Sequence, residues 1–108
     1  MLNLNTITMN DGNIVITKNE FLRQFESVLK EELVTVEYSQ QERKIFLTKL
    51  TMPDHLKEEG FLDPFLEELL NQISEGSDRV VPTSPEIAKF IRKNRRKYKS
   101  LLPVGINI

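Results

Sequence analysis

The stretch that most constrains the fold is Leu56-Lys57-Glu58-Glu59-Gly60-Phe61-Leu62-Asp63-Pro64-Phe65. It lies between an apolar run that ends at Met52 and a segment with helical periodicity. A loop at the start of a helix can bind an anion, because the first N–H groups of the helix lack partners and its dipole favours negative charge. Here one glycine stands beside two glutamates. The question is whether this loop binds an anion or has only a structural role.

An amphipathic helix is predicted directly after this loop. Asp63 and Pro64 form a suitable N-cap and first-turn pair, and Gly76 would end the helix. Polar residues lie on the opposite face from the apolar ones, so we expect the apolar face to belong to the core. The apolar positions at helical spacing are Phe61, Leu62, Phe65, Leu66, Leu69, Leu70 and Ile73.

Strands are predicted before the loop. Residues 33–38 are rich in β-branched side chains that alternate in polarity, and residues 44–52 form a second apolar run that Pro53 stops. Residues 19–30 fit either helical spacing or strand alternation, and both interpretations stay open. Residues 6–17 predict a hairpin, with Asp-Gly at its turn.

A strand and a second helix are predicted after the first helix. Residues 79–81 read as a short buried strand that Pro82 closes. Thr83-Ser84-Pro85-Glu86 resembles a capping box and would open a helix that runs to about Arg96. The order of elements predicts an α+β fold with a mixed, mainly antiparallel sheet and two principal helices. On the second helix, one side would carry Lys89, Arg92, Lys93 and Arg96.

Length and composition limit the classes of function. A chain of 108 residues forms one domain, 1–108, with a single modest core. No apolar run approaches the roughly 20 residues that a membrane span needs, and the N-terminus lacks the features of a signal peptide. The absence of cysteine excludes thiolate chemistry, and the single His55 cannot build a histidine metal site. We therefore expect a cytoplasmic protein without a bound metal.

Charge is distributed unevenly along the chain. Residues 1–78 carry 7 basic and 15 acidic side chains, a net charge of −8, whereas residues 79–108 carry 8 basic and 1 acidic, a net charge of +7. The basic end could attract an anionic ligand, or the two halves could neutralise each other by packing together. Nucleic acid ranks last among the partners, because acidic residues elsewhere would repel phosphate and no aromatic interleaving or recognition-helix pattern supports base reading.

Two segments together resemble a known family: Met52-Pro53-Asp54-His55-Leu56-Lys57-Glu58-Glu59-Gly60-Phe61 and Val80-Val81-Pro82-Thr83-Ser84-Pro85. They are similar to the small, single-domain members of the GCN5-related N-acetyltransferase (GNAT) superfamily. Those proteins carry a strand ending in Val-Pro, then a basic residue with Gly-x-Gly, and later an apolar strand ending in Pro-x-Cys-Pro. The resemblance covers residues 25–102 and leaves residues 1–24, with the expected hairpin, as an N-terminal extension.

The resemblance implies an acyl-CoA N-acyltransferase-like fold and acetyl transfer from acetyl-CoA to an unknown amine. In this superfamily the cofactor lies in a V-shaped gap between two strands. The pantetheine arm pairs with a strand that corresponds to residues 47–52, and the pyrophosphate rests on N–H groups of the following loop. We therefore expect exposed N–H groups aimed into a groove between parted strands. The cofactor-binding positions implied are Leu50, Met52, Lys57, Glu59, Gly60 and Phe61, together with Arg92 and Lys93 from the opposite side of the gap.

This sequence departs from the family pattern at two positions. Glu58 replaces the first glycine of the loop, and a carboxylate near a pyrophosphate is unfavourable. Ser84 replaces the cysteine, which makes Ser84 the candidate catalytic residue, although its position also fits a simple helix cap. The alternative function is therefore a catalytically inactive GNAT-fold binding or assembly module, for which a homodimer is one form. Glu37, Glu58 and Glu59 stay open as a general base.

Overall fold

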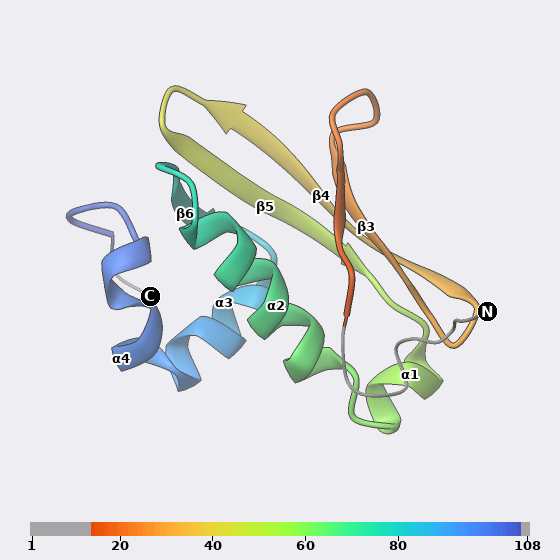
Figure 1. Cartoon of the computed structure of the whole chain (residues 1–108). Helices are drawn as coiled ribbons and strands as arrows, with labels where there is room; N and C mark the ends of the chain where they lie inside the picture. The colour runs from red at the N-terminus through yellow and green to blue at the C-terminus, as the bar shows by residue number, and fades with distance from the viewer. Residues whose placement is uncertain (1–13, 107–108) are drawn as a thin grey trace.

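The computed structural model describes residues 14–106. These residues form one five-stranded sheet in the order β2-β3-β4-β5-β6, in which β5 and β6 are parallel and all other pairs are antiparallel. The mixed, mainly antiparallel sheet with α2 and α3 as principal helices confirms the predicted fold class (Figure 1). In chain order the elements are β2 (Thr17–Asn19), β3 (Gln24–Leu29), β4 (Glu32–Gln41), β5 (Lys44–Thr51), α1 (Asp54–Glu58), α2 (Leu62–Ser74), β6 (Arg79–Pro82), α3 (Pro85–Lys93), α4 (Arg95–Tyr98) and the 3₁₀ turn η2 (Lys99–Leu101).

The core lies between the sheet and α2 with α3. The apolar face of α2 is buried, as predicted from its spacing, and includes Phe65, Leu66 and Leu69 with no exposed surface. Alternating residues of the strands supply the other side of this core, because successive side chains of a strand point to opposite faces. Those strand residues include Val34, Val36, Ile45, Leu47 and Val80.

Both strands predicted before the loop are present, and β3 settles the open interpretation of residues 19–30. β3 pairs with β4 along its whole length, so its two-residue period decides which side chains are buried. Lys30 and Glu31 join the two strands in a tight turn with φ values of 51° and 67°. The hairpin predicted for residues 6–17 lies largely outside the described residues.

The side-chain capping interactions predicted at the starts of the two helices are absent. α2 begins at Leu62 with Phe61 as its N-cap, so Asp63 lies inside the first turn and caps nothing. The N–H of Phe61 is already hydrogen-bonded, and its carbonyl accepts the first helical bond from Phe65, which fixes the start. Ser84 is the N-cap of α3 but makes no side-chain cap, and Glu86 pairs elsewhere, so no capping box forms.

The predicted second helix also ends early. α3 stops at Lys93, because Asn94 leaves the helical conformation with φ −120° and ψ 39°. The Asn94 side chain donates to the Phe90 carbonyl at 2.9 Å, a local bond that competes with the helix. Arg96 therefore lies on α4 and does not share a helix face with Arg92 and Lys93. No helix among residues 14–106 combines the length and apolar character that crossing a membrane requires.

Candidate functional site

A gap between β5 and β6 is the main feature of the candidate site. The two strands pair from Lys44 with Arg79 to Leu47 with Pro82. β5 then continues to Thr51, whereas the chain after Pro82 turns into α3. Along residues 48–51, the edge of β5 that faces β6 has no strand partner in the described part of the chain. Strands that part in this way leave backbone donors and acceptors available to a ligand.

The carbonyl of Leu47 holds the point where the strands separate, which we call the fork. It accepts hydrogen bonds from the N–H groups of Thr83 and Ser84, both at 3.0 Å, and from the Thr83 hydroxyl at 3.1 Å. Because these donors come from the residues after β6, they fix the end of β6 to β5 at this residue. Ser84 therefore lies at the fork and is only 3% exposed.

A β-bulge in the pairing of β5 with β4 explains why β5 separates from β6 at this point. Glu37 of β4 pairs with Lys49, and Tyr38 pairs with Leu47, so Thr48 is an extra residue on β5. The Thr48 hydroxyl donates to the Glu37 carbonyl at 3.1 Å and holds the bulge. A bulge bends its strand and increases the local twist. The bend thus falls directly after the last residue of β5 that pairs with β6.

The loop that follows β5 is folded as a short helix, α1, which the sequence did not predict. The Gly60 N–H donates to the Lys57 carbonyl and the Phe61 N–H donates to the Leu56 carbonyl, both at 3.0 Å. This pair of bonds, with Gly60 at φ +94°, is a Schellman cap at the end of α1. The Glu59 N–H also donates within the loop, to His55 at 3.0 Å. The loop therefore uses the N–H groups of residues 59–61 for its own structure.

Both lysines near this loop are paired with carboxylates. Lys57 Nζ lies 2.8 Å from Glu86 Oε2, a contact that joins α1 to the first turn of α3. Lys30 Nζ, from the β3–β4 turn, lies 3.0 Å from Glu59 Oε1 and 5.8 Å from the centre of the Phe61 ring. The sequence did not predict Lys30 or Glu86 at this site. No local signal could have found them, because each pair joins residues far apart in the chain.

His55 ties α1 to the β3–β4 turn. Its Nε2 pairs with the Glu32 carboxylate, and its Nδ1 lies 3.4 Å from Glu59 Oε2. The hydrogen bond to Glu59, followed by the contact with Glu32, raises the pKa of His55 above 6.5. The hydrogen bonds from Lys30 and then His55 lower the pKa of the Glu59 carboxyl. The imidazolium form of His55 is thus favoured between two carboxylates.

The unpaired side-chain charges of residues 54–63 are all negative. Asp54, Glu58 and Asp63 are exposed, and no side chain among residues 14–106 forms an ion pair or hydrogen bond with them. The free N–H groups nearest to them are those at the start of α2, where no side-chain cap is present. The gap thus offers the hydrogen-bonding edge that a pantetheine arm needs. The loop, by contrast, does not fit the diphosphate of coenzyme A.

The implied cofactor-binding residues do not all come together. Leu50 and Met52 lie on or just after the free part of β5, and Lys57, Glu59, Gly60 and Phe61 form the loop. Arg92 and Lys93 are exposed at the far end of α3, which begins at the fork and runs away from α1 (Figure 1).

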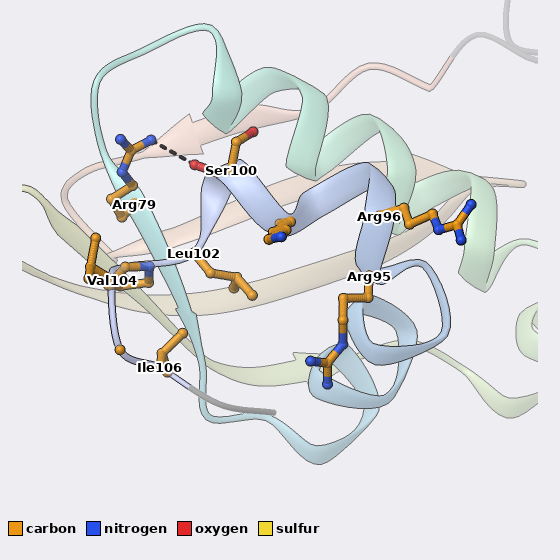
Figure 2. A pocket seen from close by; sticks show the side chains of 10 residues that line it. Arg79, Arg95, Arg96, Ser100, Leu102, Val104 and Ile106 are labelled. Carbon is orange, nitrogen blue, oxygen red and sulfur yellow. Dashed lines mark hydrogen bonds between the residues drawn. The ribbon is translucent and has the colours of Figure 1, made fainter.

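A separate basic hollow of about 860 Å³ lies between the start of β6 and the segment after α3 (Figure 2). Arg79 Nη1 donates to the Ser100 carbonyl there at 2.8 Å. Since the gap opens at the other end of β6, this hollow is not part of it. Its lining includes Arg95, Arg96, Lys99, Leu102, Val104 and Ile106.

A scan against family models matches residues 24–101 to the family described as GCN5-related N-acetyl-transferase. The search of curated proteins found no match. The matched region contains the parted strands, the loop and the fork, and it spans most of the 108 residues. The chain therefore belongs to the GCN5-related N-acetyltransferase family.

Proposed function

We propose that this chain transfers an acetyl group from acetyl-CoA to an amine, with the pantetheine arm held in the gap between β5 and β6. The observation that supports this most strongly is the parting of the two strands directly after Leu47 and Pro82. An extended arm with amide groups can bind to the free edge of a strand as an added strand would. Membership in the acetyltransferase family agrees with this use of the gap.

The free edge of β5 would orient the arm. Backbone groups of residues 48–51 would bind its amides, with the partly buried Leu50 beside it, whereas Met52 is buried in the core beneath. Acetyl-CoA supplies a thioester whose carbonyl carbon an amine can attack. With the nucleotide end toward α1, the thioester end would lie near the fork, where the Ser84 N–H is bonded to the Leu47 carbonyl.

The transfer needs a proton for the departing thiolate. The amine nitrogen bonds to the carbonyl carbon, the carbon–sulfur bond breaks, and the amine loses one proton to a base while the sulfur takes one up. Ser84 is our candidate for the residue that passes this proton to the sulfur, and a proton from solvent would restore its hydroxyl. It is not suited to act as a nucleophile, because none of residues 14–106 places a histidine or carboxylate in hydrogen-bond contact with its hydroxyl.

The test combines a binding and a kinetic measurement. We expect millimolar acetyl-CoA to raise the melting temperature, since a ligand that binds only the folded state stabilises it. Amide chemical shifts should change at residues 47–52 and at Thr83 and Ser84. Ser84→Ala should lower kcat and leave the Kd of the donor unchanged. The proposal fails if acetyl-CoA produces neither a thermal shift nor chemical-shift changes at these positions.

A second candidate function is a non-enzymatic assembly module. It is favoured by the closed loop around Gly60 and by an exposed apolar pair on the face of the sheet opposite the helices. On that face Val28 and Leu33 are direct cross-strand neighbours, 59% and 55% exposed. This function predicts a dimer in sedimentation that Val28→Thr weakens, together with no response to acetyl-CoA. A monomer that turns over acetyl-CoA would exclude it.

A further inference from the structure

The negative side-chain charge of the loop after β5 would repel the phosphate groups of acetyl-CoA, the family's usual donor. Residues 54–63 contain four acidic side chains and one lysine. That lysine, Lys57, pairs with Glu86, and the nearby Lys30 pairs with Glu59. Residues 1–13 and 107–108 contain no lysine or arginine that could supply a further cation. A phosphate placed here would meet unpaired carboxylates, Glu58 among them, and no unpaired lysine of the loop or of the β3–β4 turn.

The backbone of the loop offers little compensation. An anion-binding loop directs several consecutive N–H groups at its ligand. Here the N–H groups of Glu59, Gly60 and Phe61 are hydrogen-bonded to carbonyls of α1. Pro64 in the first turn of α2 has no N–H at all. The first turn also carries Asp63, whose negative charge occupies the end of the helix that would otherwise attract a phosphate.

The gap itself does not share these obstacles. Its shape depends on the bulge at Thr48 and on the hydrogen bonds to the Leu47 carbonyl, none of which involves a charged side chain. A neutral arm can therefore bind along β5 without entering the acidic loop.

We infer that this protein recognises its acyl donor through the pantetheine arm alone, so that its donor class is pantetheine thioesters with or without a nucleotide. The inference rests on the proposed function, because it assigns the part of the donor that the gap binds. Such an arm has two sources: a free pantetheine thioester and the phosphopantetheine end of a larger carrier. Both share the neutral segment that β5 would bind.

The first experiment measures Kd by calorimetry on the full chain. The probes are acetyl-pantetheine, acetyl-phosphopantetheine and acetyl-CoA, each at low and at moderate salt. We expect acetyl-pantetheine to bind at least as tightly as acetyl-CoA. Added salt should tighten acetyl-CoA binding, because it screens repulsion from the carboxylates, and should leave acetyl-pantetheine unchanged.

Two charge variants test the cause. Glu58→Gln should tighten acetyl-CoA by up to about tenfold, which corresponds to about 1.4 kcal/mol, without affecting acetyl-pantetheine. Glu86→Gln should act in the same direction by releasing Lys57. Glu75→Gln is the matched control, since Glu75 is exposed at the opposite end of α2 and should change neither Kd.

The outcomes separate this inference from the proposed function. If acetyl-CoA binds about tenfold more tightly than acetyl-pantetheine and salt weakens it, the inference is overturned while the proposed function stands. An unchanged Kd for acetyl-CoA in both charge variants would also overturn it. If none of the three probes binds, the proposed function is overturned and the inference with it.

Discussion

Replacement of Gly60 by alanine tests whether the Schellman cap fixes the loop. Gly60 has φ +94°, and an added Cβ would meet no described heavy atom within 4 Å. The cost is therefore conformational and not steric. A left-handed alanine costs about 1–2 kcal/mol, and reduced freedom of the unfolded chain returns about 0.4–1 kcal/mol. We expect Gly60→Ala to lower the free energy of unfolding by about 1 kcal/mol.

Urea unfolding and thermal melting provide the measurement. With about 2.1 cal/mol/K of unfolding entropy per residue, 1 kcal/mol corresponds to a decrease of about 4 °C in this chain. Gly76→Ala is the matched control, because Gly76 lacks a positive φ and its added Cβ would lie 3.6 Å from the Ile73 carbonyl, an ordinary contact. That variant should be neutral or slightly stabilising. Gly60→Asn should fall between wild type and Gly60→Ala, since asparagine tolerates the left-handed region.

The difference in unfolding free energy between Gly60→Ala and Gly76→Ala tests whether residue 60 is left-handed. Equal effects of the two glycine variants, or a stabilising Gly60→Ala, would show that residue 60 does not hold a left-handed conformation in solution. The Schellman cap would then be absent, and the N–H groups of Gly60 and Phe61 would be available to a ligand.

Two further predictions concern stability. Leu66→Ala removes a side chain of α2 with no exposed surface and should cost about 2–5 kcal/mol in urea unfolding, whereas Val104→Ala, fully exposed, should cost nothing measurable. The raised pKa of His55 implies stability that is fully present below pH 6.5 and is lost as pH rises through the folded-state value. Unfolding followed across this range should show that loss in wild type, and His55→Gln should abolish it because glutamine does not ionise beside Glu32 and Glu59. An identical slope in both proteins would contradict the assignment.

The elements with strong periodicity could be predicted from the sequence. Two-residue alternation identified β4 and β5, and the helical spacing after Phe61 identified α2, because burial of one face imposes the pattern directly. The family and the position of the gap followed from two short motifs in the right order. The periodic elements and each of the two motifs depend on residues close together in the chain.

Features that depend on competition between local signals could not be predicted. Asp63 with Pro64 is a good helix start, yet the Schellman cap at Gly60 makes Phe61 the N-cap instead. Asn94 interrupts a pattern that otherwise favours one long helix. Ion pairs between distant segments, such as Lys57 with Glu86, leave no trace in either segment alone.

The substitution at residue 58 links the charge of the loop to its conformation. Glycine in a helix is less favourable than glutamate by about 0.5–1 kcal/mol, so glutamate as the last residue of α1 favours the helical conformation there, while its negative charge at the C-terminal end of the helix offsets part of this gain. A stable α1 in turn supplies the carbonyls that take up the N–H groups of residues 59–61. The same side chain adds a negative charge where a diphosphate would lie. Both effects act against the phosphate end of a donor, while the fork at Leu47 and the bulge at Thr48 depend on neither. The two halves of the proposed donor site can therefore be separated physically, and our inference predicts that this chain uses only the half that would bind the arm.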